Sequence, residues 1–247
     1  NKLIFKTKQL IYGYVNKIAA RKSKKIITYT DYVKDDIARF TRINSRKVKT
    51  IFLAADPITE KAKPIESLVT KQFIMYVGRP QPHKNLSRLI EAFQQLQQKH
   101  PDLHLVLAGK IDVLYRRHER RVKRANIQNV VFTDFISDGQ LRWLYEHCAA
   151  YVFPSLSEGF GLPGLEAMQH GAPVASSNAT CLPEVYGNAA EYFDPTDVSD
   201  MANKINKLLT NSKRKSELVK LGTKQSARYT WRKTAEETLA VYDDILA

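Results

Sequence analysis

Short apolar runs alternate with helical patterns from Phe73 onward, and this alternation constrains the fold more than any other feature of the chain. Residues 73–77 form a continuous apolar run of strand length, and apolar side chains over 86–96 recur at helical spacing. Strands without polar alternation are typical of parallel sheets covered by helices on both faces. Right-handed helical crossovers connect such strands. The sequence therefore predicts an α/β domain with a doubly wound parallel sheet over 72–230.

The same patterns place the remaining elements. Before this region we expect a basic helix over 2–25, short strands at 26–29 and 48–53, and a helix between them capped by Thr30 or Asp31. Further strands are expected at 103–108, 130–132, 151–153, 173–175 and 192–193, and helices near 86–96, 113–125, 141–145, 163–170, 182, 197–209, 213–227 and 231–246.

Positive charge is concentrated at the start of the chain. Residues 1–53 hold 14 Lys or Arg and three acids, whereas the remainder holds 25 basic and 22 acidic residues. Basic clusters beside apolar and aromatic residues are attracted to acidic lipid headgroups, so one interpretation is contact with an anionic membrane surface. A merely solvated basic face is the alternative. Nucleic-acid binding is not expected, because no helix-turn-helix, zinc or RNA-binding signature accompanies the charge.

The two cysteines and the hydropathy pattern indicate the cellular compartment of the protein. Cys148 and Cys181 form neither a CxxC pair nor a zinc-ligand spacing, and nothing indicates a disulfide framework. We therefore expect a cytoplasmic protein, peripheral on the inner face of the membrane if the basic segment binds lipid. No run of 18 apolar residues suggests a transmembrane helix. The chain starts at Asn1 rather than Met, and we expect the native protein to begin upstream.

The segment 154–168 carries the strongest chemical signal. It follows an expected buried strand and opens a helix, with Pro163 suited to the first helical position. Glycines within it permit unusual dihedral angles and close backbone approach. Amide groups at a helix N-terminus, together with the helix dipole, form an anion site suited to a diphosphate. Glu158 and Glu166, with seven residues between them, flank this loop and make the pattern far more specific.

The spacing of Glu158 and Glu166 resembles the acidic pair of family 4 retaining glycosyltransferases, which have the GT-B fold of two Rossmann-like domains. Several further segments, in the same order along the chain, are similar to the family's donor-domain motifs. They are Tyr76-Val-Gly-Arg79, Lys84-Asn-Leu86, Leu89-Ile-Glu-Ala-Phe93, Gly171-Ala-Pro-Val174 and Pro183-Glu-Val-Tyr-Gly187.

The resemblance implies a role for each matched residue. Glu166 would accept hydrogen bonds from the ribose, and Glu158 would bind hydroxyls of the donor sugar. Arg79 and Lys84 would neutralise the diphosphate as the leaving group gains charge, which makes Glu158, Arg79 and Lys84 the implied catalytic residues. The backbone near 135–136 would meet the base. The full donor-binding set is Gly78, Arg79, Lys84, Gly109, Lys110, Phe135, Ile136, Glu158, Gly159, Phe160, Gly161, Leu162 and Glu166.

Simpler interpretations of these residues stay open. An acid in the first turn of a helix, such as Glu166, favours the dipole without any ligand. Glu158 could be a solvated loop acid, and Arg79 and Lys84 could form ordinary ion pairs. The two glutamates are not interpreted as the flanking carboxylates of a glycoside hydrolase, because the resemblance assigns them to binding.

The resemblance also implies a domain organisation. Residues 1–53 would be the remnant of an N-terminal, acceptor-side domain, 54–71 a linker, 72–230 the donor-binding domain, and 231–247 a helix that returns to the N-terminal side. The implied function is retaining transfer of a sugar from a nucleotide diphosphate sugar to a glycan or lipid-linked acceptor, without metal or other cofactor. The alternatives are a non-catalytic binding module and a GT-B sugar-nucleotide epimerase. The sugar, the base and the acceptor stay open.

Overall fold

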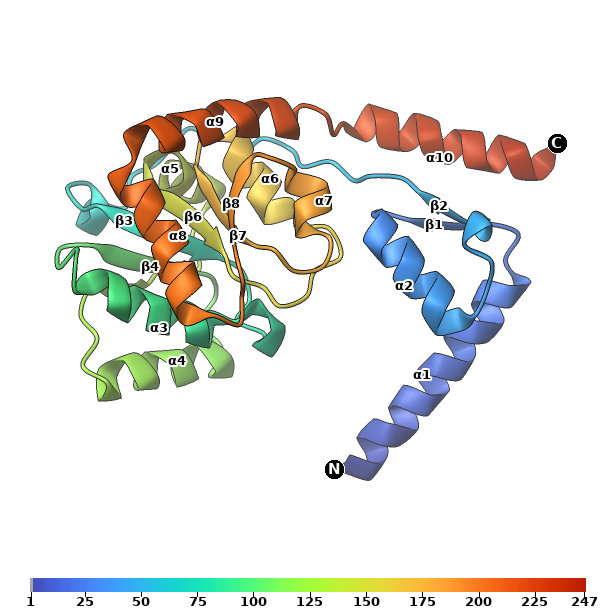
Figure 1. The fold of residues 1–247 in the computed structure, drawn as a ribbon, viewed down its shortest axis with the longest axis horizontal. Helices are drawn as coiled ribbons and strands as arrows, with labels where there is room; N and C mark the ends of the chain where they lie inside the picture. Colours follow the sequence, from blue (N-terminus) through green and yellow to red (C-terminus); the bar gives the residue numbers. More distant parts are fainter. Residues whose placement is uncertain (1) are drawn as a thin grey trace. The chain divides into compact units, whose positions relative to one another are not determined.

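The computed structural model describes residues 2–247, with side chains from residue 4 onward, and divides into two compact units (Figure 1). Unit 1 combines residues 1–54 with residues 229–247, and unit 2 spans Ala55–Arg228. Among the residues described, no helix combines the length and apolar character needed to cross a membrane.

Unit 2 contains a six-stranded parallel sheet with the strand order β5-β4-β3-β6-β7-β8. The order reverses direction between β3 and β6, as in a doubly wound sheet. The predicted α/β fold with a parallel sheet is therefore confirmed. The strands are β3 (Phe73–Val77), β4 (His104–Ala108), β5 (Val130–Phe132), β6 (Ala150–Phe153), β7 (Val174–Ser177) and β8 (Ala190–Phe193).

Helices cover both faces of this sheet, with α3, α4 and α8 on one face and α5, α6 and α9 on the other (Figure 1). α3 packs on α8, and α6 packs on α9. Their apolar stripes bury residues such as Leu89, Phe93 and Ile205 completely. The helices are α3 (Leu86–Gln97), α4 (Val113–Arg124), α5 (Asp138–His147), α6 (Leu162–Gln169), α7 (Leu182–Tyr186), α8 (Val198–Thr210) and α9 (Ser212–Ser226), with 3-10 turns η2 (Glu66–Leu68) and η3 (Pro82–Lys84).

The segment expected to be a linker, 54–71, belongs to unit 2 from Ala55 onward. It is bound there by hydrogen bonds rather than being a free connection. Lys63 N donates to Gly139 O over 2.9 Å, and Gly139 N donates to Glu60 Oε2 over 3.1 Å. The Arg142 guanidinium donates to the carbonyls of Ile58 and Glu60. These bonds satisfy polar groups of both segments.

Unit 1 is built around a two-stranded parallel sheet of β1 (Ile26–Thr28) and β2 (Val48–Thr50). Thr30 caps α2 as one of the two expected residues, because its Oγ1 accepts a hydrogen bond from Val33 N. Thr234 Oγ1 donates to Phe52 O and attaches the last helix. The helices of unit 1 are α1 (Lys2–Lys22), α2 (Asp31–Thr41), η1 (Ser45–Lys47) and α10 (Trp231–Leu246).

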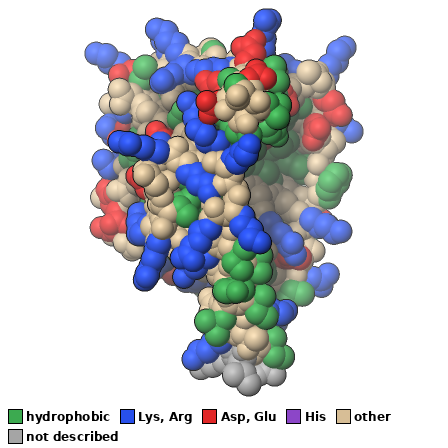
Figure 2. Space-filling view, turned by 90° about the vertical axis from the view of Figure 1, so that its right-hand side faces the viewer, with side chains coloured by type: hydrophobic (Ala, Val, Ile, Leu, Met, Phe, Trp, Pro, Cys, Tyr) green, Lys and Arg blue, Asp and Glu red, His purple; other side chains and the backbone are tan. Residues whose placement is uncertain are grey.

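Apolar side chains are exposed along α1, with lysines and arginines beside them (Figure 2). Leu10 is 75% exposed and Tyr14 69%. Other exposed members of this surface are Ile4, Phe5, Ile11, Tyr12 and Val15. Whether this basic segment contacts an anionic membrane stays a prediction.

Candidate functional site

Lys84 and Glu158 form an ion pair beyond the carboxyl ends of β3 and β6. Lys84 Nζ lies 2.6 Å from Glu158 Oε1, and the two side chains are only 21% and 12% exposed. The same Nζ lies 5.5 Å from the centre of the Phe153 ring, a cation–π distance. Shielding from water strengthens such a pair relative to an exposed one. The structure thus brings together two residues that are 74 positions apart in the sequence.

A buried asparagine joins the loops that carry this pair. Asn85 follows η3 with φ of 62° and is only 4% exposed. Its Nδ2 donates to Pro154 O over 3.0 Å and to Pro195 O over 2.7 Å. Leu156 N in turn donates to His83 O over 2.7 Å. The loop after β3 and the loop after β6 are therefore tied together on both sides of Lys84.

The backbone of Glu158 is fixed by the loop that precedes α7. Glu158 N donates to Thr180 Oγ1 over 3.1 Å, and Cys181 Sγ donates to Glu158 O over 3.3 Å. Burial raises the pKa of the Cys181 thiol to about 12, so this thiol is a neutral donor and not a nucleophile. Nearby in sequence, Ser155 Oγ is fully buried and has no hydrogen-bond partner within the described chain.

The glycine loop before α6 is shaped around Tyr186. Gly161, the N-cap of α6, has φ of 100°, and its carbonyl accepts a 2.5 Å hydrogen bond from the Tyr186 hydroxyl. A Cβ on Gly161 or on Gly164 would overlap that hydroxyl. Glycine is therefore required at both positions because a larger residue would collide with Tyr186, and at Gly161 also because of its positive φ. The positive end of the α6 dipole lies at this loop.

Glu166 lies in the second turn of α6 beside a fully buried tyrosine. The Tyr145 hydroxyl donates to Glu166 Oε2 over 3.3 Å. Burial raises the pKa of Glu166 above its usual value, while the hydrogen bond from Tyr145 acts in the opposite direction. At neutral pH the carboxylate keeps acceptor capacity beyond this one bond.

The ends of β3 and β4 are joined by a second buried hydroxyl. The single O–H proton of Tyr115 is shared between two carbonyls, with Oη 2.8 Å from Gly78 O and 3.1 Å from Ala108 O. Next to Gly78, the Arg79 side chain is 72% exposed and lies 3.3 Å from Asp112, the N-cap of α4. Hydrogen bonding to backbone amides, first that of Tyr115, lowers the pKa of the Asp112 carboxyl.

Asp134 connects the ends of β4 and β5. It forms an isolated bridge with Gly109, and its Oδ1 accepts from Ile111 N over 2.8 Å. This leaves Phe135 80% exposed just beyond the sheet. Of the other sequence-predicted residues, Lys110 is exposed, Ile136, Gly159 and Leu162 are partly buried, and Phe160 is buried.

All the sequence-predicted site residues thus follow the carboxyl ends of strands β3 to β6, the edge where ligands bind in such sheets. The arrangement offers two cations, a helix N-terminus and two acceptor carboxylates. Sequence reasoning did not assign roles to Tyr186, Tyr145, Asn85 or Thr180, because their partners lie far away in the chain. In the described part of the chain, no cluster of three or more His, Cys, Asp and Glu side chains is arranged to hold a metal ion.

The Glu166→Gln variant is expected to be more stable than the wild type at pH 7. Because the folded pKa of Glu166 lies above its unfolded value of 4.5, the protonated carboxyl favours folding, and this contribution is lost as the pH rises through the folded pKa. Glutamine mimics the protonated form at every pH. Urea unfolding between pH 4 and pH 8 should show a gain that grows with pH. Glu66→Gln, at an exposed position of the same unit, is the control, and a Glu166→Gln variant less stable at pH 7 would contradict the prediction.

The Tyr186→Phe variant is expected to lose about 1 kcal/mol of unfolding free energy, because a buried hydrogen bond is removed. Gly161 O keeps its bond from Gly164 N, so the loop should loosen rather than unfold. Amide hydrogen exchange over 159–165 should accelerate. Tyr192→Phe removes a similar hydroxyl-to-carbonyl bond, to Gly187 O, and is the matched control. Equal exchange rates in the two variants would show that Tyr186 does not position this loop.

Comparisons with known proteins identify what this chain is similar to. The family model described as glycosyl transferases group 1 matches residues 58–225. A serotype-specific mannosyltransferase of Escherichia coli is 34% identical over 252 residues, covering 94% of this chain and 30% of the relative. The O-antigen chain mannosyltransferase B of Escherichia coli is 30% identical over 236 residues, covering 89% of this chain and 60% of the relative.

Solved structures share the fold at lower identity. Sucrose-phosphate synthase from Thermosynechococcus elongatus superimposes with a TM-score of 0.81 at 22% identity, covering 95% of this chain and 61% of that one. Anabaena HepE, in complex with UDP and glucose, gives 0.76 at 18% identity, covering 91% and 64%. The chain spans only 30% to 60% of the two mannosyltransferases. Because the family model covers most of its length, the chain belongs to the group 1 glycosyl transferases.

Proposed function

We propose that this chain supplies the donor-binding half of a retaining glycosyltransferase of family 4, which transfers a hexose from a nucleotide diphosphate sugar to an acceptor. The observation that carries the proposal is the shielded Lys84–Glu158 pair, which lies in the loops beside the N-terminus of α6. A cation, a helix dipole and carboxylates at one sheet edge suit a ligand with a diphosphate between two polyhydroxyl groups. The mannosyltransferase relatives make mannose the first sugar to test.

In this proposal each charged residue acts on one part of the donor. Lys84 and Arg79 bind the diphosphate and stabilise the charge that develops on the leaving oxygen. Glu158 accepts hydrogen bonds from sugar hydroxyls, and Glu166 accepts them from the ribose. Lys84 then bridges Glu158 and the phosphate, since an ammonium has three donors. The backbone near Phe135 and Ile136 contacts the base.

The proposed transfer retains the anomeric configuration by attack on the same face of the sugar. The bond from the anomeric carbon to the phosphate oxygen breaks, and the acceptor oxygen bonds to that carbon. The leaving phosphate receives the acceptor proton. The cations and the α6 amides provide the neutralisation without a metal ion, so EDTA should leave donor affinity unchanged.

The acceptor is proposed to be bound by a domain of which unit 1 is a part. A two-stranded parallel sheet is too small to bury the apolar side chains along α1, such as Leu10 and Tyr14. The relatives are also longer than this chain, which leaves room for such a domain in them.

The Lys84→Gln variant should bind a nucleoside diphosphate about 10- to 100-fold more weakly, because a charge-assisted hydrogen bond is lost. Binding of the matching nucleoside should change little. Calorimetry would follow a thermal-shift panel that selects the base. Lys99→Gln, at an exposed position in the turn that follows α3, is the control for the lost charge. The double variant Lys84→Gln/Glu158→Gln avoids leaving a shielded carboxylate unpaired. Equal losses for nucleoside and diphosphate would contradict the proposed role.

The 247-residue chain should bind the nucleotide diphosphate sugar but transfer no sugar. Slow hydrolysis of the bound donor by water should release nucleoside diphosphate. Positioning of two reactants contributes about 7–11 kcal/mol to such reactions, and the proposal places acceptor positioning largely outside this chain. Adding mannoside acceptors should leave the release rate unchanged. An acceptor-dependent rise of tenfold or more would show that this chain already contains a working acceptor site.

A further inference from the structure

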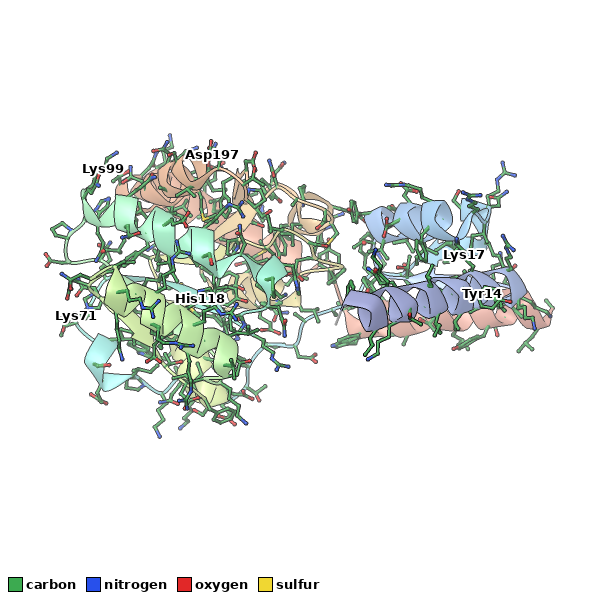
Figure 3. All side chains as sticks on the ribbon, turned by 90° about the horizontal axis from the view of Figure 1, so that it is seen from below. Tyr14, Lys17, Lys71, Lys99, His118 and Asp197 are labelled. Carbon is green, nitrogen blue, oxygen red and sulfur yellow. The ribbon has the colours of Figure 1, made fainter. Side chains whose placement is uncertain are left out.

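One face of α4 is lined by cations. Counted at 100° per residue, they occupy a single arc of the helix, opposite the buried Tyr115 and Val122. Figure 3 looks at the molecule from below and shows α4 on the outside of unit 2, with the half-buried His118 labelled. This α4 basic face consists of six exposed residues, Arg116, Arg117, Arg120, Arg121, Lys123 and Arg124.

Little negative charge compensates this face. Arg121 pairs with Glu91 of α3, and Glu119 is the one acid within α4. The other five cations have no acidic side chain within ion-pair distance in the described part of the chain. Arg117, Arg120, Arg121 and Arg124, together with Ala125, line an open hollow of about 540 Å³ on this face.

This arrangement opposes the stability of the helix itself. Arg120 lies three or four residues from Arg116, Arg117 and Arg124, and like charges at these spacings repel each other. The helix dipole favours cations in the last turn but disfavours them near the start, where Arg116 lies. An anionic partner removes the repulsion, and arginine binds phosphate through two parallel hydrogen bonds.

We propose that the α4 basic face is a docking surface for anionic phospholipid headgroups. Its cations spread over one broad exposed arc of the helix, which suits headgroups that move laterally to meet it. Val113, 72% exposed on the same arc, adds an apolar contact at the start of the helix. Single-stranded nucleic acid is the poorer match, since its sites stack bases on aromatic side chains and this face exposes none.

This surface is separate from the basic segment 1–53 and from the donor site. It belongs to unit 2, and none of its six residues lies in the loops that carry Lys84, Glu158 and Glu166. The inference therefore stands whether or not the proposed sugar transfer is correct. It assigns a contact with a lipid surface to unit 2, apart from the basic segment 1–53.

Vesicle binding of the whole chain tests the proposal. The variant Arg117→Gln/Arg120→Gln/Arg124→Gln removes three of the four arginines that line the hollow and leaves Arg121 with its partner Glu91. Glutamine is a good helix former, so the helix should be kept. The control Lys99→Gln/Lys213→Gln/Lys220→Gln removes the same charge at exposed, scattered positions. Each cation near an anionic bilayer contributes about fivefold in affinity, so the α4 variant should bind vesicles with one-third phosphatidylglycerol on the order of 100-fold more weakly. The control should change much less, because distant charges are screened.

The outcomes separate the proposal from its rivals. Loss in the α4 variant alone, shrinking at high salt and with unchanged thermal stability, supports lipid docking by α4. An equal change of vesicle affinity in both variants would show that binding depends on the overall charge of the chain or on residues 1–53. That result would overturn the proposal. Binding of the wild type to pure phosphatidylcholine at the same affinity would also overturn it. An α4 variant that keeps vesicle binding but loses heparin binding would identify a linear polyanion as the partner instead.

Discussion

The hydroxyl groups of fully buried tyrosines are the constraint on which the site depends. Five tyrosines of unit 2 are fully buried, and each brings a polar atom into the core. Leaving a buried hydroxyl unpaired costs about 1–3 kcal/mol, and of these five hydroxyls Tyr151 Oη alone has no partner among the described residues. Tyr186 finds its partner in Gly161 O, Tyr115 in Gly78 O and Ala108 O, and Tyr145 in Glu166. The rings pack in the core, while the hydroxyls of Tyr186 and Tyr115 hold backbone carbonyls at the sheet edge and that of Tyr145 holds the side chain of Glu166.

This constraint explains why the glycines occur where they do. Gly161 and Gly164 leave the space that the Tyr186 hydroxyl occupies, and a side chain at either position would displace it. The conformation of the loop before α6 therefore depends on its contact with the core residue Tyr186 as well as on its own dihedral angles. A rigid loop at a helix N-terminus is what an anionic ligand needs, because its amides do not have to be reorganised on binding.

Charge is used in two different ways on unit 2. At the sheet edge Lys84 is shielded, paired with Glu158 and held between two joined loops, so it can act at a defined position. On α4 the arginines are exposed and mostly unpaired. They contribute jointly to the positive electrostatic potential of this surface rather than holding one ligand group in a fixed position. The first arrangement suits a small ligand with a fixed geometry, and the second suits an extended anionic surface. Both lie on one doubly wound domain, at the carboxyl edge of its sheet and on the outer surface of one covering helix.

The sequence by itself determined the fold class, the order of strands and helices, and the segments that follow the strand ends, because burial and periodicity are local patterns. It also identified Lys84 and Glu158 as charged residues of that edge. Tertiary structure alone decided that these two pair directly, that the expected linker from Ala55 onward is bound to α5, and that Tyr186 fills the space beside two glycines. It also decided that six cations of α4 share one exposed arc with few acids near them. The physical reason is that these are contacts between segments distant in sequence, and the packing of helices on the sheet sets which side chains meet.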